Sequence, residues 1–552
     1  MEEAKKGISR RSFLKGVAVG AAGIAAAGAL AGCGEETGTK TPPKEGEEPK
    51  KLSFEVPPEP IPEKDIKETV TADVVVVGAG LAGLCAALSA AEAGAKTVVV
   101  EKRETFTARG MHNAAVGSRV QKKLGIEIDK RQAVRDIVKW CGNRVKEELH
   151  WLFVNKSGEC MNWLLDMTEA EGITAEMWAA HYKGPDYYEY PVTHIFVGGP
   201  NAAKFAHNVD VATVLEKNAK KKGVDFYYKT PAEQLIRPDN GRVGGVIAKN
   251  EKGEYIRFEA KKAVILCAGD YSGDKEMLEY YSPMALRADA YVYTPVGVNT
   301  GDGHKMGMWI GAAMQQDYPH PAMIHTQAGA WSYCFLHVNK HGYRYENEDK
   351  TAQAVCMSKM MQPDNIGWAV YDSKFLDLLP ETIKIGGGMF WDQVNRTWGK
   401  PFNKEAERAM LERHIKQGLV VTADTIEELA QKMKVPSENL KATVERYNQL
   451  AVMKDDVDFG KRSELLFPID KPPFYAGLMK SALLVVVGGL CVNAKMQVLD
   501  KKGNVIPGLY AAGNNAGSFF AQDYPTIFPG HSHGRCITFG RLAGQYAAAE
   551  RV

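Results

Sequence analysis

Residues 73–102 read DVVVVGAGLAGLCAALSAAEAGAKTVVVEK. The run from Asp73 to Val77 is typical of a strand buried on both faces of a parallel sheet, and it leads directly into three glycines and an alanine-rich helix. Gly78 allows a tight turn, Gly80 lets the backbone approach a pyrophosphate, and Gly83 lets the helix pack closely on the strand. The unpaired N–H groups at the start of that helix favour a phosphate. The stretch therefore predicts a dinucleotide-binding unit.

The residues around this stretch extend the same pattern. A second strand, Thr97 to Val100, ends in Glu101, and an acidic residue about 20 positions after the glycines can accept hydrogen bonds from ribose hydroxyls. Further segments supply a buried strand ending near Gly269, a strand leading into Gly513, and a helix from about Thr538; they read KKAVILCAGDYS (261–272), GNVIPGLYAAGN (503–514) and TFGRLAGQYAAA (538–549).

The N-terminus carries the pattern of an export signal. Arg10 and Arg11 stand in SRRSFLKG, ahead of a weakly apolar run from Val17 to Ala31 that is too short to span a bilayer comfortably. The run ends in LAGC, whose Cys33 matches a lipobox cysteine. Residues 1–33 therefore predict a twin-arginine lipoprotein signal, and acylation of Cys33 would hold the protein at the outer face of the cytoplasmic membrane.

Composition limits the remaining possibilities. Residues 34–71 are rich in Glu, Lys, Pro and Thr, which predicts a disordered tether. The other 480 or so residues exceed one simple core and predict two domains. A formal net charge of +2 argues against a nucleic-acid partner. Eight cysteines follow Cys33 without any CxxC or CxxCH motif, so we expect buried thiols, no c-type haem and no metal site.

From about Ala72 to the C-terminus the chain resembles the fumarate reductase/succinate dehydrogenase flavoprotein family. The resemblance rests on the segments above and on GEYIRFEAKKAVILCAG (253–269), NTGDGHKMGMWIGAA (299–313), VNKHGYRYENE (338–348) and ADTIEELA (423–430). It implies an α/β fold, in which a Rossmann-like FAD-binding domain (72–291 and 481–552) carries an inserted α+β substrate-capping domain (292–480). The cofactor-binding residues that we expect are Gly78, Ala79, Gly80, Gly83, Glu101, Gly110, Gly269, Gly513, Asn514 and Gly530.

Three positions depart from the family's dicarboxylate reductases, which hold their substrate with His and Arg side chains. The His before a Thr-Met-Gly-Gly stretch corresponds to Val485, one Arg corresponds to Ile527, and the proton-donating Arg corresponds to Ala352. Because a dicarboxylate removed from water needs charged partners, we do not expect fumarate to be the substrate.

The same departures predict a pocket for a bulky, neutral, small-molecule substrate. Trp331, Tyr333 and Phe335 in QAGAWSYCF add aromatic side chains, which could equally fill the core between the domains. Within the family, the chain is most similar to exported reductases of cardiac glycosides from gut actinobacteria. This similarity implies an α,β-unsaturated lactone on a steroid scaffold as the substrate.

The family's chemistry implies hydride transfer from reduced FAD to an activated C=C bond and a proton from a side-chain acid. Gly530, eight residues before Thr538, matches the family glycine whose amide faces flavin or substrate. The candidate acids, in order, are Tyr333, then His320, then Tyr524 and His531.

Electrons must come from elsewhere, and we expect a membrane cytochrome or a quinol-linked donor. A [4Fe-4S] cluster stays open as an alternative, although the cysteine spacing does not favour it. Other readings also stay open: a reductase of another unsaturated acid or enone, a 3-ketosteroid dehydrogenase, which would need a tyrosine near Ala352, or a flavin-binding lipoprotein without turnover.

Overall fold

The computed structural model describes residues 52–180, 182–184, 187–202, 206–292, 295–316, 319–327, 334–386 and 397–551. The predicted signal, with Arg10, Arg11 and Cys33, and the aromatic residues Trp331 and Tyr333 lie outside this part of the chain. No helix within the described residues is long and apolar enough to cross a membrane.

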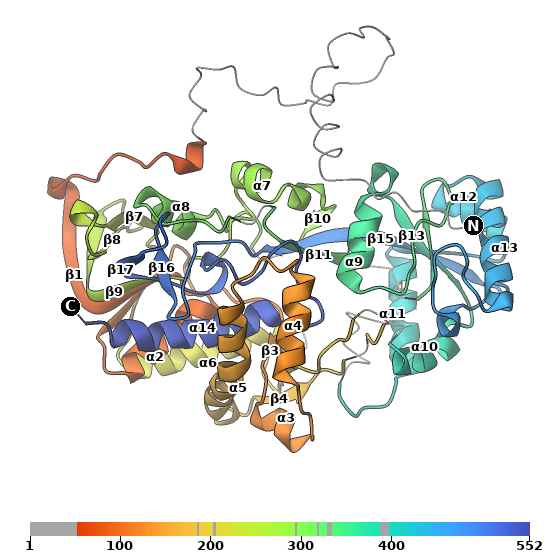
Figure 1. The fold of residues 1–552 in the computed structure, drawn as a ribbon, viewed down its shortest axis with the longest axis horizontal. Coiled ribbons are helices and arrows are strands. Elements are labelled where there is room, and N and C mark those ends of the chain that lie inside the picture. The colour runs from red at the N-terminus through yellow and green to blue at the C-terminus, as the bar shows by residue number, and fades with distance from the viewer. Residues whose placement is uncertain are drawn as a thin grey trace, which may run out of the picture. The chain divides into compact units, whose positions relative to one another are not determined.

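The central element is an eight-stranded sheet built around the glycine-rich stretch (Figure 1). β1 pairs in parallel with β2 on one side and β9 on the other, and its last four residues, Val74–Val77, are buried. The strand order is β16-β17-β9-β1-β2-β6, and β8 pairs with β9 and with β7 outside this order. The strands are β16 (Gln497–Leu499), β17 (Val505–Ala511), β9 (Tyr255–Leu266), β1 (Ile66–Val77), β2 (Thr97–Val100), β6 (Asp225–Tyr227), β8 (Gly245–Lys249) and β7 (Ala232–Ile236). The predicted strands therefore lie where the sequence placed them.

Two helices rich in small residues lie side by side next to this sheet, α2 (Leu81–Glu92) and α14 (His531–Ala548) (Figure 1). A Cβ at Gly540 would lie 2.5 Å from the Ala82 carbonyl oxygen, and one at Gly544 would lie 2.2 Å from the Ala86 carbonyl oxygen. The glycines therefore permit an unusually close backbone approach. α14 begins seven residues before the expected start at Thr538, because Gly530 adopts a left-handed conformation (φ 82°) and ends the preceding loop.

A second, six-stranded sheet belongs to the capping region. Its strands follow the order β10-β15-β13-β12, with β11 and β14 also paired to β15. They are β10 (Ala290–Tyr291), β11 (Ala322–Gln327), β12 (Leu336–Asn339), β13 (Gly367–Asp372), β14 (Val420–Ala423) and β15 (Phe474–Val486). The expected domain boundary at Lys480 falls inside β15, which is continuous through both halves of this sheet (Figure 1).

The remaining elements surround these two sheets. A small third sheet has the order β3-β5-β4, with β3 (Asn113–Ala114), β5 (Thr193–Val197) and β4 (Thr174–Met177). The other helices are α3 (Arg119–Lys123), α4 (Lys130–Trp140), α5 (Glu147–Glu169), α6 (His207–Lys221), α7 (Lys275–Tyr281), α8 (Asp302–Trp309), α9 (Ala352–Met360), α10 (Phe375–Lys384), α11 (Lys404–Lys416), α12 (Ile426–Met433) and α13 (Ser437–Met453).

The expectation that the disordered tether extends to Thr71 is wrong for its last part. β1 already begins at Ile66, and Phe54 is 2% exposed. The Phe54 ring packs against Tyr280 and Tyr281, and its carbonyl oxygen accepts a hydrogen bond from the Trp309 indole. The Ser53 and Ile61 N–H groups also donate to the Glu276 and Gln234 side chains. The polar composition of this segment did not reveal these contacts.

Candidate functional site

A cavity of about 770 Å³ lies at the carboxyl ends of the parallel strands β1, β2 and β9. One end is lined by Gly78 and Gly80 after β1 and by Glu101 after β2. This is the place where open α/β sheets bind ligands. The volume is within the range of cofactor sites, which is roughly 300–1,000 Å³.

The three glycines of the first loop play different physical roles. A Cβ at Gly78 would lie 2.5 Å from the Cys267 carbonyl oxygen, and one at Gly83 would lie 1.9 Å from the Gly78 carbonyl oxygen, so both positions exclude a side chain on packing grounds. A Cβ at Gly80 would meet only the Thr107 carbonyl oxygen, at 3.7 Å, and would otherwise enter the cavity. Space at Gly80 is therefore available to a ligand.

Glu101 fixes the conformation of this loop. Its carboxylate accepts hydrogen bonds from the Ala79 N–H (2.7 Å) and the Arg103 N–H (2.9 Å). Gly80 is the N-cap residue of α2 and supplies no capping side chain, so the first N–H groups of the helix remain available to an anion. This end of the cavity suits the pyrophosphate and ribose of a dinucleotide.

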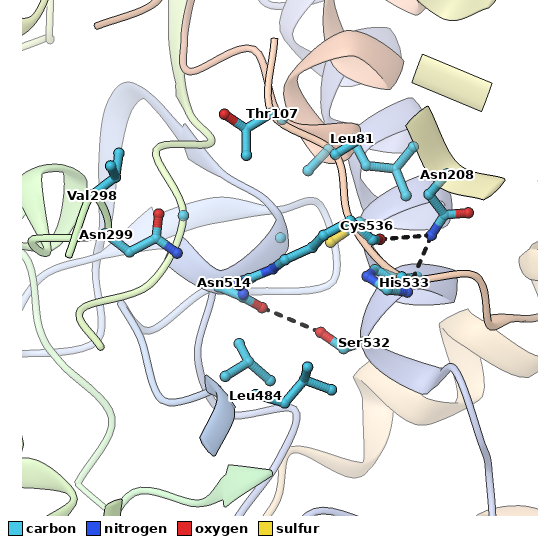
Figure 2. Close-up of a pocket in the computed structure, with 18 of the residues that line it drawn as sticks. Leu81, Thr107, Asn208, Val298, Asn299, Leu484, Asn514, Ser532, His533 and Cys536 are labelled. Carbon is cyan, nitrogen blue, oxygen red and sulfur yellow. Dashed lines mark hydrogen bonds between the residues drawn. The ribbon is translucent and has the colours of Figure 1, made fainter. Parts of the chain in front are cut away.

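Another part of the cavity wall is polar and is formed by segments far apart in the sequence. The Ser532 hydroxyl donates to the Asn514 side chain (3.3 Å), and Asn208 contacts the His533 ring at 3.3 Å (Figure 2). His533 also contacts the His112 carbonyl oxygen at 2.9 Å, and burial lowers its pKa to about 4. The ring is therefore neutral at pH 7 and offers hydrogen bonding without charge.

Most of the predicted cofactor residues line this cavity. Ala79 and Gly83 do not line it, but they shape the loop behind it. Which of these residues touch the cofactor stays a prediction. The lining residues are Gly78, Gly80, Glu101, Gly110, Gly269, Gly513, Asn514 and Gly530.

Among the candidate acids, Tyr524 lies on the cavity wall. It is 2% exposed, and its hydroxyl oxygen accepts a hydrogen bond from the Ser532 N–H at 2.9 Å. Burial raises the pKa of the Tyr524 phenol, so the group keeps its proton at neutral pH. Tyr333, the first candidate, lies outside the described residues.

The two histidine candidates are not on the cavity wall. The two ring nitrogens of His320 contact the Tyr271 hydroxyl (2.6 Å) and the Gln315 carbonyl oxygen (3.1 Å), and burial lowers its pKa to about 4. His531 is buried beside the rings of Phe519 and Phe528, and burial lowers its pKa well below the usual value. Both positions fit packing residues rather than proton donors.

The expectation of an apolar substrate wall holds for only part of the residues that suggested it. Val485 lines the cavity, but Ile527 and Ala352 are buried away from it. Ala352 is the first residue of α9, and Phe335 stacks on Tyr371 in the core of the cap, with ring centroids 5.0 Å apart. At these positions the apolar side chains serve packing.

Several lining residues were not predicted from the sequence. They come from β11, from β15, from the cap helix α11 and from the first turns of α14, and only the tertiary structure brings them together. Only Ser532 and His533 could have been predicted to line the cavity, because they are polar and directly follow a glycine motif in the sequence. The residues are Met323, His325, Thr326, Met410, His414, Leu484, Ser532, His533 and Cys536.

The described residues contain no group of three or more His, Cys, Asp or Glu side chains that could hold a metal ion. The eight cysteines of the described part are free thiols, seven of them buried. The idea of a [4Fe-4S] cluster therefore has no support.

Comparison with known proteins identifies the cofactor. The profile of the FAD binding domain family matches residues 73–525. The chain belongs to this family. Within it, the chain belongs with the fumarate reductase/succinate dehydrogenase flavoproteins, and the protein is an FAD-dependent oxidoreductase. The glycine loop and the free helix N-terminus of α2 fit the pyrophosphate of FAD.

The relatives span nearly the whole of the described chain. It is 27% identical to a vinyl phenol reductase of Lactiplantibacillus plantarum, over 86% of this chain and 96% of the relative. It is 28% identical to a urocanate reductase of Eggerthella lenta, over 87% of this chain and 75% of the relative. A 3-ketosteroid-Δ4-(5α)-dehydrogenase of Rhodococcus jostii shares the fold, with a TM-score of 0.68 and 23% identity over 88% of this chain and 99% of that chain.

Proposed function

We propose that this protein reduces a conjugated C=C bond in a neutral small molecule. The names of its relatives support this proposal, since vinyl phenol and urocanate both contain a conjugated C=C bond. When bound and reduced, FAD supplies a hydride. One hydride and one proton add across the double bond, so the substrate gains two electrons and FAD loses two.

The observation that carries the proposal is the position of Tyr524. Tyr524 lines the same cavity as the FAD-binding loop, its phenol keeps its proton at neutral pH, and the Ser532 N–H donates to its oxygen. Ser532 lies in the first turn of α14, where the helix dipole stabilises negative charge by about 0.3–1 kcal/mol and more when buried. Tyr524 can therefore give a proton to the substrate carbon and hold the resulting negative charge.

The part of the cavity wall formed by β11 and β15 favours neutral substrates. Val485 pairs with Met323 across β15 and β11. Leu484, the preceding residue of β15, also lines the cavity (Figure 2). His325 also lines the cavity, and burial lowers its pKa, so it carries no charge at neutral pH. None of these side chains offers a charge to a carboxylate placed beside it, and the carboxylate would lose its hydration there.

The lysine and arginine side chains on the described cavity wall are committed elsewhere. Lys102 pairs with Asp302 (2.8 Å), and Arg109 pairs with Asp270 (3.2 Å). Arg103 follows Glu101 and donates to Thr107, at the dinucleotide end. The lysine and arginine side chains that line the described cavity therefore already have partners within the protein.

The test is anaerobic reoxidation of the reduced holoenzyme, followed by flavin absorbance. We expect reoxidation by neutral substrates such as a steroid butenolide, a vinyl phenol or an enone, and none by fumarate at matched concentration. The steroid lactone is our specific proposal, and a strong preference for vinyl phenol would replace it. Rapid reoxidation by fumarate, or none by any compound, would overturn the proposed function.

A pair of variants tests the role of Tyr524. Tyr524→Phe keeps the ring and removes the proton, so we expect reoxidation to slow by roughly 10²–10⁴-fold. Tyr371→Phe is the matched control, because this buried tyrosine lies in the cap core and its hydroxyl has no hydrogen-bond partner among the residues that the structure describes. If Tyr524→Phe reacts as fast as Tyr371→Phe, another residue is the acid.

We further propose that the protein is exported and lipid-anchored, and that a membrane cytochrome or a quinol-linked donor reduces its FAD. The support is the motif around Arg10, Arg11 and Cys33. We expect Cys33→Ala to release folded enzyme outside the cytoplasm, and the double change Arg10→Lys, Arg11→Lys to block export. Fractionation of cells measures both, and membrane retention of an exported Cys33→Ala variant would contradict the anchor.

A further inference from the structure

Arg535 is a fully buried cation next to the cofactor cavity. It is 0% exposed and is the largest of the fully buried side chains. It lies in the first turns of α14, between Ser532 and His533 on one side and Cys536 on the other, and these three neighbours line the cavity. A charge in this position acts on whatever occupies the cavity.

The contacts of Arg535 contain no anion. One guanidinium nitrogen donates to the Ala516 carbonyl oxygen (3.1 Å) and another to the Asn514 side-chain oxygen (2.7 Å), while the group lies 4.8 Å from the centre of the Phe520 ring. Within the described chain no carboxylate forms an ion pair with it. Burial lowers the pKa of Arg535 to about 10, so it remains charged at neutral pH.

The carboxylate that Asn514 links to Arg535 is already paired. Asn514, which lines the cavity, contacts Asp270 through its side-chain nitrogen at 3.5 Å, and Asp270 pairs with Arg109 at 3.2 Å. The series of contacting side chains from Arg535 through Asn514 and Asp270 to Arg109 therefore holds two positive charges and one negative charge. A buried charge without a partner costs several kcal/mol, which a folded protein tolerates where a ligand supplies the opposite charge.

We propose that Arg535 raises the reduction potential of bound FAD by favouring the reduced flavin as an anion, with Asn514 as the hydrogen-bonded link to the cavity. Uptake of two electrons and one proton adds one negative charge to the flavin. The attraction between unit charges in a partly dry site is several times that in bulk water. Arg535 thus acts through its positive charge, which stabilises the reduced flavin, and it does not contact the substrate.

Other occupants fit this charge less well. The pyrophosphate of FAD is expected at Gly80, where the first N–H groups of α2 are available to bind it without Arg535. The aromatic contacts with Phe519 and Phe520 stabilise a guanidinium but carry no net charge to balance it. An anion that forms only when the cofactor is reduced accounts for a cation that the protein leaves unbalanced.

The test measures the midpoint potential of the bound flavin, with xanthine and xanthine oxidase as the slow reductant and a reference dye. We expect Arg535→Met to make reduction at least tenfold less favourable, which is about 30 mV more negative for a two-electron couple. Arg535→Lys, which keeps the positive charge, should have a midpoint potential close to that of the wild type. The control is Arg541→Met, on the same helix. The Arg541 side chain pairs with Glu92 and lies over the Trp163 ring, so the flavin potential of this variant should equal that of the wild type.

A second measurement uses the unaltered holoenzyme, in case Arg535→Met does not fold. One proton per two electrons gives a slope of about 30 mV per pH unit, and two protons give about 59 mV. If Arg535 stabilises the anion, the change to the smaller slope occurs at a lower pH than for free FAD. An unshifted slope change, or an Arg535→Met potential equal to that of Arg541→Met, would overturn the inference. Neither experiment needs a substrate, so the proposed function is tested separately.

Discussion

Alanine substitutions at Gly80 and Gly83 should separate cofactor binding from folding. At Gly80 the backbone (φ −76°, ψ 179°) suits any residue, and an added Cβ meets protein only at 3.7 Å. We therefore expect apo Gly80→Ala to be as stable as the wild type or about 0.4–1 kcal/mol more stable. Its methyl group would occupy cofactor space and disrupt one charge-assisted hydrogen bond, which is worth about 1.5–3 kcal/mol and weakens FAD binding roughly 10- to 150-fold.

Gly83→Ala should behave in the opposite way. Its Cβ would lie 1.9 Å from the Gly78 carbonyl oxygen, so α2 must move away from the loop by about 1 Å. Such overpacking against backbone typically costs about 1–3 kcal/mol or more.

Urea unfolding of the apo proteins and titration with FAD, followed by flavin fluorescence, measure the two effects. The reasoning is refuted if Gly80→Ala binds FAD with wild-type affinity, or if its apo form loses as much stability as Gly83→Ala.

Two further substitutions test buried charges. Burial raises the pKa of Asp523 to about 6, so the folded state holds the proton more tightly than the unfolded state, and stability falls as pH rises from about 4 through 6. Asp523→Asn, which keeps an acceptor for Gln353, should therefore add up to ~3 kcal/mol at pH 8 and little at pH 4; equal urea midpoints at pH 8 would contradict this. Lys461 lies 3.3 Å from Glu348, with both side chains fully buried, so Lys461→Met should cost about 3 kcal/mol in urea unfolding. A loss below about 1 kcal/mol would show that Arg344, which also pairs with Glu348, suffices.

Local sequence signals predicted the parts of the site that a short segment forms by itself. The strand before Gly78, the turn and the helix after Gly80 are contiguous, and Glu101 ends the neighbouring strand, so spacing alone placed them. The cavity wall at Tyr524, Val485 and the start of α14 depends on packing between distant segments, which a single sequence does not reveal.

The errors have the same origin. The family resemblance assigned Ile527 and Ala352 to positions that hold charged groups in dicarboxylate reductases, but a resemblance does not say whether a smaller apolar side chain still reaches the cavity, and neither residue lines it. Phe54 is the opposite error: its polar surroundings in the sequence predicted exposure, but its ring is buried against Tyr281. Tertiary contacts decide whether a given side chain is buried, and amino-acid composition predicts burial only as an average over many residues.

The continuity of β15 has a mechanical consequence. Residues 474–479 pair with β13 and β14 in the cap, and residues 480–486 pair with β11 beside the cavity, where Val485 forms part of the wall. A hydrogen-bonded strand resists bending, so it works as a lever rather than a hinge: a tilt of the cap end moves the cavity end with it. Substitutions that repack the far side of the cap sheet should thus alter the shape presented to substrate, although they lie distant from any reacting atom.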